Sequence, residues 1–111
     1  MNEAKMHEYI NADFGPLEPL LKDPDVMEIM VNRYDTIYIE KHGQLIQMEA
    51  QFRDEEHLLE VIQRIAEPMG RELNESNPIL DLRLPDSSRV HIVGRPIALN
   101  GPTMNIRKFT R

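Results

Sequence analysis

Apolar and polar residues alternate between residues 28 and 51, which is the pattern of strands that bury one face of a sheet. Ile29 and Val31 share one side of the first such segment, and Ile37 and Ile39 share one side of the second. A tight hairpin is expected at Gly43, because glycine tolerates a positive φ. The pattern predicts three consecutive strands, at residues 28–32, 36–41 and 44–51.

Helical spacing marks three other segments. The longest is 54–67, where Leu58, Ile62 and Ile65 recur at intervals of three and four residues. Asp54 is suited to cap its N-terminus, because a short carboxylate side chain can accept a hydrogen bond from the first turn. Two shorter helices are expected before the first strand, at residues 3–13 and 16–22.

The last third of the chain again reads as strands. Three are predicted, at 79–84, at 89–94 with an extension that could reach residue 99, and at 103–109. The resulting order is ααβββαβββ, in which helices and strands cluster instead of alternating strictly. This order predicts an α+β fold, with a mainly antiparallel sheet of about six strands and helices packed on one face.

Arginines alternate with apolar residues on these last strands. If Leu82 and Val90 both face the helices, the two strands must be joined by an odd-length loop within residues 85–89. That register places Arg83 and Arg89 together on the opposite face of the sheet.

The final strand adds a third cation to this outward face. Arg107 alternates with inward-facing Met104 and Ile106, and Arg95 is expected nearby. Like charges that lie opposite each other on a sheet are destabilising by up to about 1 kcal/mol, so an anion should lie among them. Two readings stay open: Asp81 and Asp86 supply that charge as a solvated network, or a phosphate binds there, since guanidinium groups suit bidentate contact with oxyanions.

Charge is polarised along the chain. The 111 residues carry a net charge of −6, but residues 1–81 carry −11 and residues 82–111 carry +5. An acidic whole argues against nonspecific binding to nucleic acid or to an anionic membrane, whereas a basic end suggests a local anion site or a docking face for an acidic partner. There is no cysteine, no apolar run long enough for a membrane span and no signal-peptide pattern at the start, so we expect a cytoplasmic location.

Other candidate sites are weaker. The four histidines lack the spacing of metal ligands, so no metal site is expected. Glu28 and Glu40 lie on neighbouring predicted strands and could imitate a paired acid and base. Exposed carboxylates on a sheet usually face solvent, so we assign them no catalysis.

A series of short motifs in a fixed order resembles one family. They lie at residues 23–32 (DPDVMEIMVN), 39–43 (IEKHG), 70–71 (GR), 81–86 (DLRLPD), 89–90 (RV) and 101–109 (GPTMNIRKF). Over residues 16–110 the chain resembles the N-terminal domain of the ATPases that drive type II and type IV secretion and tight-adherence pili. Residues 1–15 are expected to be an N-terminal extension outside this resemblance.

The resemblance implies a cytoplasmic motor subunit, peripheral to the inner membrane through its partners. It implies a homo-hexameric ring, a RecA-like domain that binds ATP and Mg²⁺, and contact with an inner-membrane platform protein, without a nucleic-acid partner. The matching motifs make Arg89 and Arg107, with Arg83 next, the candidates for contacting nucleotide phosphates from this domain. A phosphate-cradling Gly-x-x-x-x-Gly-Lys-Ser/Thr loop does not occur in the sequence, so the RecA-like domain is expected to lie outside it and no catalytic residue is assigned.

One position departs from the family pattern, and two other function classes stay open. The family usually has glycine after Leu-Pro-Asp, where this chain has Ser87. The first alternative is an adaptor domain whose acidic helical face docks a membrane platform protein, with purely structural arginines. The second is a stand-alone sensor of a small ligand.

Overall fold

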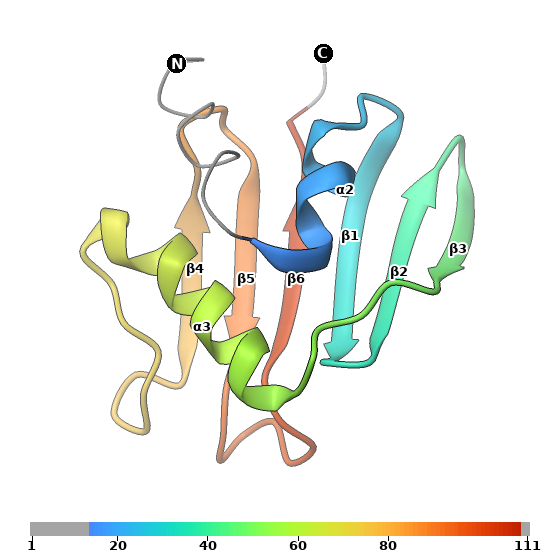
Figure 1. Cartoon of the computed structure of the whole chain (residues 1–111). Helices are drawn as coiled ribbons and strands as arrows, with labels where there is room; N and C mark the ends of the chain where they lie inside the picture. The colour runs from blue at the N-terminus through green and yellow to red at the C-terminus, as the bar shows by residue number, and fades with distance from the viewer. Residues whose placement is uncertain (1–13, 110–111) are drawn as a thin grey trace.

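Six strands and four short helical elements make up the computed structural model, which describes residues 14–109 (Figure 1). The helical elements are η1 (Gly15–Leu17), α2 (Glu18–Lys22), α3 (Glu55–Ala66) and η2 (Glu67–Met69). The strands are β1 (Val26–Arg33), β2 (Thr36–Lys41), β3 (Gln44–Met48), β4 (Ile79–Arg83), β5 (Arg89–Val93) and β6 (Thr103–Arg107). The predicted α+β class and element order are confirmed, while the helix expected at residues 3–13 lies outside the described residues.

All six strands form one antiparallel sheet in the order β3-β2-β1-β6-β5-β4. Two meanders, β1 to β3 and β4 to β6, are joined side by side where the last strand in sequence, β6, pairs with the first, β1. The join pairs Ile29 with Ile106 and Glu28 with Arg107. It therefore brings β1 against the arginine-bearing strand β6.

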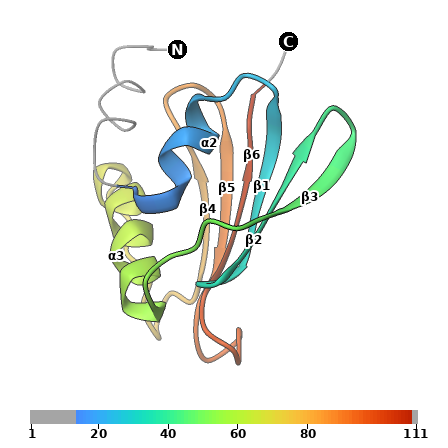
Figure 2. The same ribbon diagram turned by 45° about the vertical axis from the view of Figure 1, so that its right-hand side comes forward.

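The core lies between one face of the sheet and the helices, which form a second layer on that face (Figure 2). Each central strand contributes alternate side chains to it, such as Ile92 from β5 and Ile106 from β6, both fully buried. The helix α3 lays its own apolar stripe on them, with Leu58 and Ile62 also fully buried. Burial of one such side chain contributes about 1.5–3 kcal/mol, so the inward face is strongly specified and the outward face is left to polar residues.

Local signals fix both ends of α3. The Asp54 side chain accepts a hydrogen bond from the backbone N–H of His57 at 2.8 Å, as predicted for an N-cap. Beyond the other end, directly after η2, Gly70 adopts a φ of 71°, and the next residue, Arg71, donates its N–H to the carbonyl of Ala66, the last residue of α3. This left-handed turn satisfies carbonyl groups that the helix leaves open.

The extension of the fifth strand to residue 99 is wrong. β5 ends at Val93, and the chain turns at once, because the N–H of Ala98 donates back to the carbonyl of Gly94 at 2.9 Å. Residues 94–102 form a loop at the end of the sheet. The third strand is also shorter than predicted and ends at Met48.

Candidate functional site

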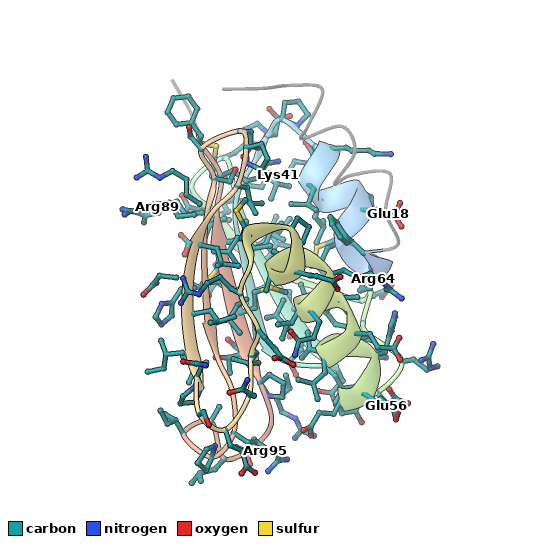
Figure 3. The ribbon with its side chains drawn as sticks, turned by 90° about the vertical axis from the view of Figure 1, so that its left-hand side faces the viewer. Glu18, Lys41, Glu56, Arg64, Arg89 and Arg95 are labelled. Atoms are coloured by element: carbon teal, nitrogen blue, oxygen red, sulfur yellow. The ribbon has the colours of Figure 1, made fainter. Side chains whose placement is uncertain are left out.

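Three arginines form one row across neighbouring strands. Arg83 on β4 lies directly opposite Arg89 on β5, and Arg89 lies directly opposite Arg107 on β6. The predicted register is confirmed, because Leu82 pairs with Val90 and both are buried. All three arginines are exposed on the face that looks away from the helices, where Figure 3 shows Arg89 projecting.

The β4–β5 turn sets this register with an odd number of residues, 84–88. Ser87 adopts the left-handed conformation, with a φ of 72°, at the position where the family usually has glycine. The turn is closed because the N–H of Ser87 donates to the carbonyl of Leu84 at 2.9 Å, and the N–H of Ser88 donates to Asp86 Oδ1 at 2.8 Å. Serine therefore keeps the turn conformation that glycine adopts more easily.

The arginine row borders an open hollow on the outward face, with a volume of about 670 Å³. Strands β4, β5, β6 and β1 all contribute to its wall. Its lining residues are Glu28, Asp81, Leu82, Arg83, Arg89, Val90, His91, Asn105 and Arg107. The hollow is therefore basic along one side, and polar side chains together with Leu82 and Val90 line the rest of it.

The two carboxylates expected to neutralise the row, Asp81 and Asp86, have other hydrogen-bond partners. Asp81 lies 2.6 Å from Nδ1 of His91, its partner across the β4–β5 pair. Asp86 serves the turn, where its carboxylate accepts from the backbone. Among residues 14–109, Arg83 and Arg89 have no carboxylate within ion-pair distance, so Asp81 and Asp86 make no direct ion pair with these two arginines.

An acid from a distant part of the sequence meets the row at its other end. Glu28 on β1 pairs directly with Arg107, and Oε1 of Glu28 lies 3.7 Å from Nη2 of Arg107. The other oxygen of Glu28 accepts a hydrogen bond from Nδ2 of Asn105 at 3.0 Å. No local sequence pattern predicts this contact, because it depends on which strand lies beside β6.

Arg95 does not join the row, contrary to expectation. It lies at the opposite end of the sheet from Arg89 (Figure 3), in the loop 94–102. Its guanidinium donates two hydrogen bonds to Glu55 at the start of α3. The two N–H···O distances are 2.9 and 3.1 Å, and a third N–H donates to the carbonyl of Leu99 at 3.0 Å. The hydrogen bonds from Arg95 lower the pKa of Glu55, and those with Glu55 raise the pKa of Arg95. This pair fastens a loop to a helix and is structural.

Lys108 follows Arg107 and turns to the opposite side of the sheet. Its ammonium donates to the carbonyl groups of Leu20 and Asp23 at the end of α2. Burial lowers the pKa of Lys108, because desolvation disfavours its charged form. Sequence reasoning missed this role, although a lysine next to an outward arginine on a strand must point inward and find acceptors.

Other chemistry is sparse in the part of the chain that the structure describes. No group of three or more His, Asp or Glu side chains there is placed to hold a metal ion. None of its helices is long and apolar enough to cross a bilayer. Glu28 and Glu40 do lie opposite each other, but this pair adjoins the arginine row, and Glu28 is bound to Arg107 and Asn105.

Comparison with known proteins places this geometry in a family. The model of the Type II/IV secretion system protein family matches residues 10–110. The Type IV secretion system protein VirB11 of Brucella suis is 31% identical over 105 residues, which is 92% of this chain and 29% of VirB11. An uncharacterised protein of Methanocaldococcus jannaschii is 33% identical over 98 residues, which is 86% of this chain and 18% of that protein.

A solved structure has the same fold. It is the crystal structure of the VirB11 ATPase from the Brucella suis type IV secretion system in complex with sulphate, with a TM-score of 0.79 and 28% identity. The match covers 98% of this chain and 33% of the solved one, so the chain spans about a third or less of the relatives it matches. The chain therefore belongs to the type II/IV secretion system protein family and has the fold of an N-terminal domain of its secretion ATPases.

Proposed function

We propose that this domain supplies arginines to a nucleotide held by the RecA-like domain of a secretion or pilus-assembly motor. Arg89 and Arg107, with Arg83 beside them, contact the nucleotide phosphates across the cleft between the two domains. The observation that carries the proposal is the row itself: three exposed arginines lie directly opposite one another, and two of them lack a carboxylate partner among the described residues.

Such a row is unfavourable unless an anion joins it. Like charges on adjacent strands repel, and the sheet holds Arg89 between two other guanidinium groups. Phosphate is a fitting anion, because guanidinium donates bidentate hydrogen bonds to its oxygens. The sulphate named with the VirB11 ATPase structure is an oxyanion of similar shape, which agrees with this chemistry.

The arginines would act on charge that develops during phosphoryl transfer. Positioned cations stabilise the transition state more than the ground state, and an arginine finger of this kind contributes on the order of 10³–10⁵ in rate. ATP and Mg²⁺ would be bound by the RecA-like domain, and this domain alone would not hydrolyse ATP. The same proposal includes a homo-hexameric ring, an inner-membrane platform protein as partner and a cytoplasmic location at that membrane.

The test uses the full-length ATPase of which we propose this chain is a domain. Arg89→Ala and Arg107→Ala should each lower the turnover number for ATP by at least about tenfold, because each removes a cation from the developing charge. Arg53→Ala is the matched control, since Arg53 is an exposed arginine at the start of α3, outside the hollow. It should leave turnover within twofold of the unmodified protein.

Two results would contradict the proposal. Unchanged turnover in both Arg89→Ala and Arg107→Ala, with the fold verified by circular dichroism, would remove these arginines from the reaction. Active arginine variants combined with loss of partner pull-down after charge reversal on residues 54–67 would favour the adaptor function instead.

A further inference from the structure

Glu28 is the acid that ends the arginine row. The row continues from Arg83, Arg89 and Arg107 directly onto Glu28 and then onto Glu40, so that three cations are followed by two carboxylates. The Glu28 side chain is only 18% exposed, whereas that of Arg107 is 76% exposed. The carboxylate is therefore the more tightly packed partner, and the guanidinium is the more exposed one.

Two contacts hold Glu28 in place within the hollow. Oε2 accepts a hydrogen bond of 3.0 Å from Asn105, which lies two residues before Arg107 on the same face of β6. Oε1 faces Nη2 of Arg107 at 3.7 Å, which is an ion pair but longer than a hydrogen bond. A pair this long, with its guanidinium exposed to solvent, is weak, so Arg107 can exchange this carboxylate for another anion at little cost.

We propose that Glu28 is a positioning residue of the anion site and a built-in competitor for its ligand. In the empty site Glu28 keeps Arg107 at the hollow. When a phosphate group arrives, Arg107 takes it as a bidentate partner, and Glu28 stays anchored to Asn105 while its charge opposes the ligand. Glu28 thereby weakens binding and favours release of the anion. The inference rests on the proposed function, because it assumes that the row binds phosphate.

The decisive variant is Glu28→Gln, studied in the chain of residues 1–111 with inorganic pyrophosphate as the probe. The amide oxygen of glutamine can still accept from Asn105, so only the charge is removed. A unit charge about 4 Å away acts with about 1 kcal/mol in water, so pyrophosphate should bind about fivefold more tightly at low salt. Affinity is measured by nuclear magnetic resonance titration, and the Nε–H signal of Arg107 should already shift in the ligand-free variant.

Glu40→Gln is the matched control. Glu40 lies opposite Glu28 in the same row, one strand farther from the arginines, and it does not line the hollow. Its removal should change pyrophosphate affinity by less than twofold. A gain as large as that of Glu28→Gln would reduce the effect to overall charge and overturn the assignment to Glu28.

The outcomes separate this inference from the proposed function. Unchanged or weaker pyrophosphate binding in Glu28→Gln, while Arg89→Ala and Arg107→Ala reduce binding, would overturn the role of Glu28 alone. Pyrophosphate binding that no arginine variant weakens would overturn the proposed function as well. If Glu28→Gln does not fold, Glu28→Asp replaces it, because the shorter side chain moves the negative charge away from the ligand. Pyrophosphate should then bind at least about twofold more tightly, whereas unchanged pyrophosphate affinity would overturn the proposal.

Discussion

Replacing the central arginine of the row should make the domain more stable while it impairs the site. Arg89 faces Arg107 on one side and Arg83 on the other, so Arg89→Gln relieves two like-charge contacts. Each directly opposed pair is worth roughly 0.2–1 kcal/mol, and solvent screening keeps exposed pairs toward the lower end. We expect the free energy of unfolding to rise by about 0.5–1 kcal/mol, which corresponds to a melting temperature about 2–4 °C higher.

The neighbouring arginines provide an internal control. Arg83→Gln relieves one like-charge contact, so it should gain about half as much. Arg107→Gln also relieves one, but it gives up the ion pair with Glu28, so its net change should be near zero. The expected order of stability is therefore Arg89→Gln, then Arg83→Gln, then Arg107→Gln.

Thermal unfolding by circular dichroism, in a chloride buffer of low ionic strength, measures this order. The gain should shrink in 1 M salt, where the Debye length falls to about 3 Å. Adding sulphate or pyrophosphate should raise the melting temperature of the unmodified chain more than that of Arg89→Gln, since only a binding anion stabilises by mass action. A loss of stability in Arg89→Gln, or an equal gain in all three variants, would refute the claim that the row stores repulsion.

Four further predictions concern the β4–β5 turn, the contact of the loop 94–102 with Glu55, and the partly buried Lys108. Ser87→Gly should raise the free energy of unfolding in urea by about 0.5–1 kcal/mol, because glycine adopts a φ of 72° without strain, whereas Ser87→Ala should bring no gain. Gly101→Ala should lower the free energy of unfolding by about 1–3 kcal/mol, because the φ of Gly101 is 100° and a Cβ would lie 2.9 Å from Glu55 Oε1. Gly43→Ala is the control for backbone strain alone, because Gly43 has a φ of 75° and open space around its Cβ position. Because the pKa of Glu55 is lowered in the folded domain, its contribution to stability is present above its ordinary pKa of 4.5 and is lost as the pH falls through the folded value. Glu55→Gln should therefore flatten this acidic part of a plot of the urea unfolding midpoint against pH. Lys108→Met should cost about 1–3 kcal/mol in urea unfolding, since the carbonyl of Leu20 loses its side-chain donor and that of Asp23 keeps only the N–H of Val26. No loss would contradict that role.

Alternation and local turns made the fold largely predictable from the sequence. Leu82 and Val90 had to share the buried face, and that requirement was enough to place Arg83 and Arg89 together on the outward face. Gly43 marked the β2–β3 hairpin for the same kind of local reason, and its φ of 75° agrees. The apolar–polar pattern therefore suffices to predict the pairing of strands that are neighbours in sequence, where burial or a turn residue determines it.

Contacts between distant segments were not predictable in this way. Nothing in the sequence says that β6 lies beside β1, yet that pairing brings Glu28 to Arg107 across 79 positions of sequence. The acids expected from proximity, Asp81 and Asp86, have nearer hydrogen-bond partners in His91 and the turn. Arg95 was misplaced for a related reason, because the predicted strand continued through a segment that leaves the sheet to reach α3.

Hydrogen bonds from Lys108 and Phe109 hold the chain in place just beyond Arg107. The backbone N–H of Phe109 donates to the hydroxyl of buried Ser88, in the turn that precedes Arg89, while the Lys108 backbone donates to Met27 and its ammonium holds the end of α2. These hydrogen bonds join the end of β6 to the β4–β5 turn, to β1 and to α2. The backbone at Arg107 therefore cannot rotate independently of the backbone at Arg89. The backbones that carry the three arginines should thus move as one rigid unit, so that bringing the whole row to a ligand requires motion of the domain, while each guanidinium adjusts only over the length of its side chain.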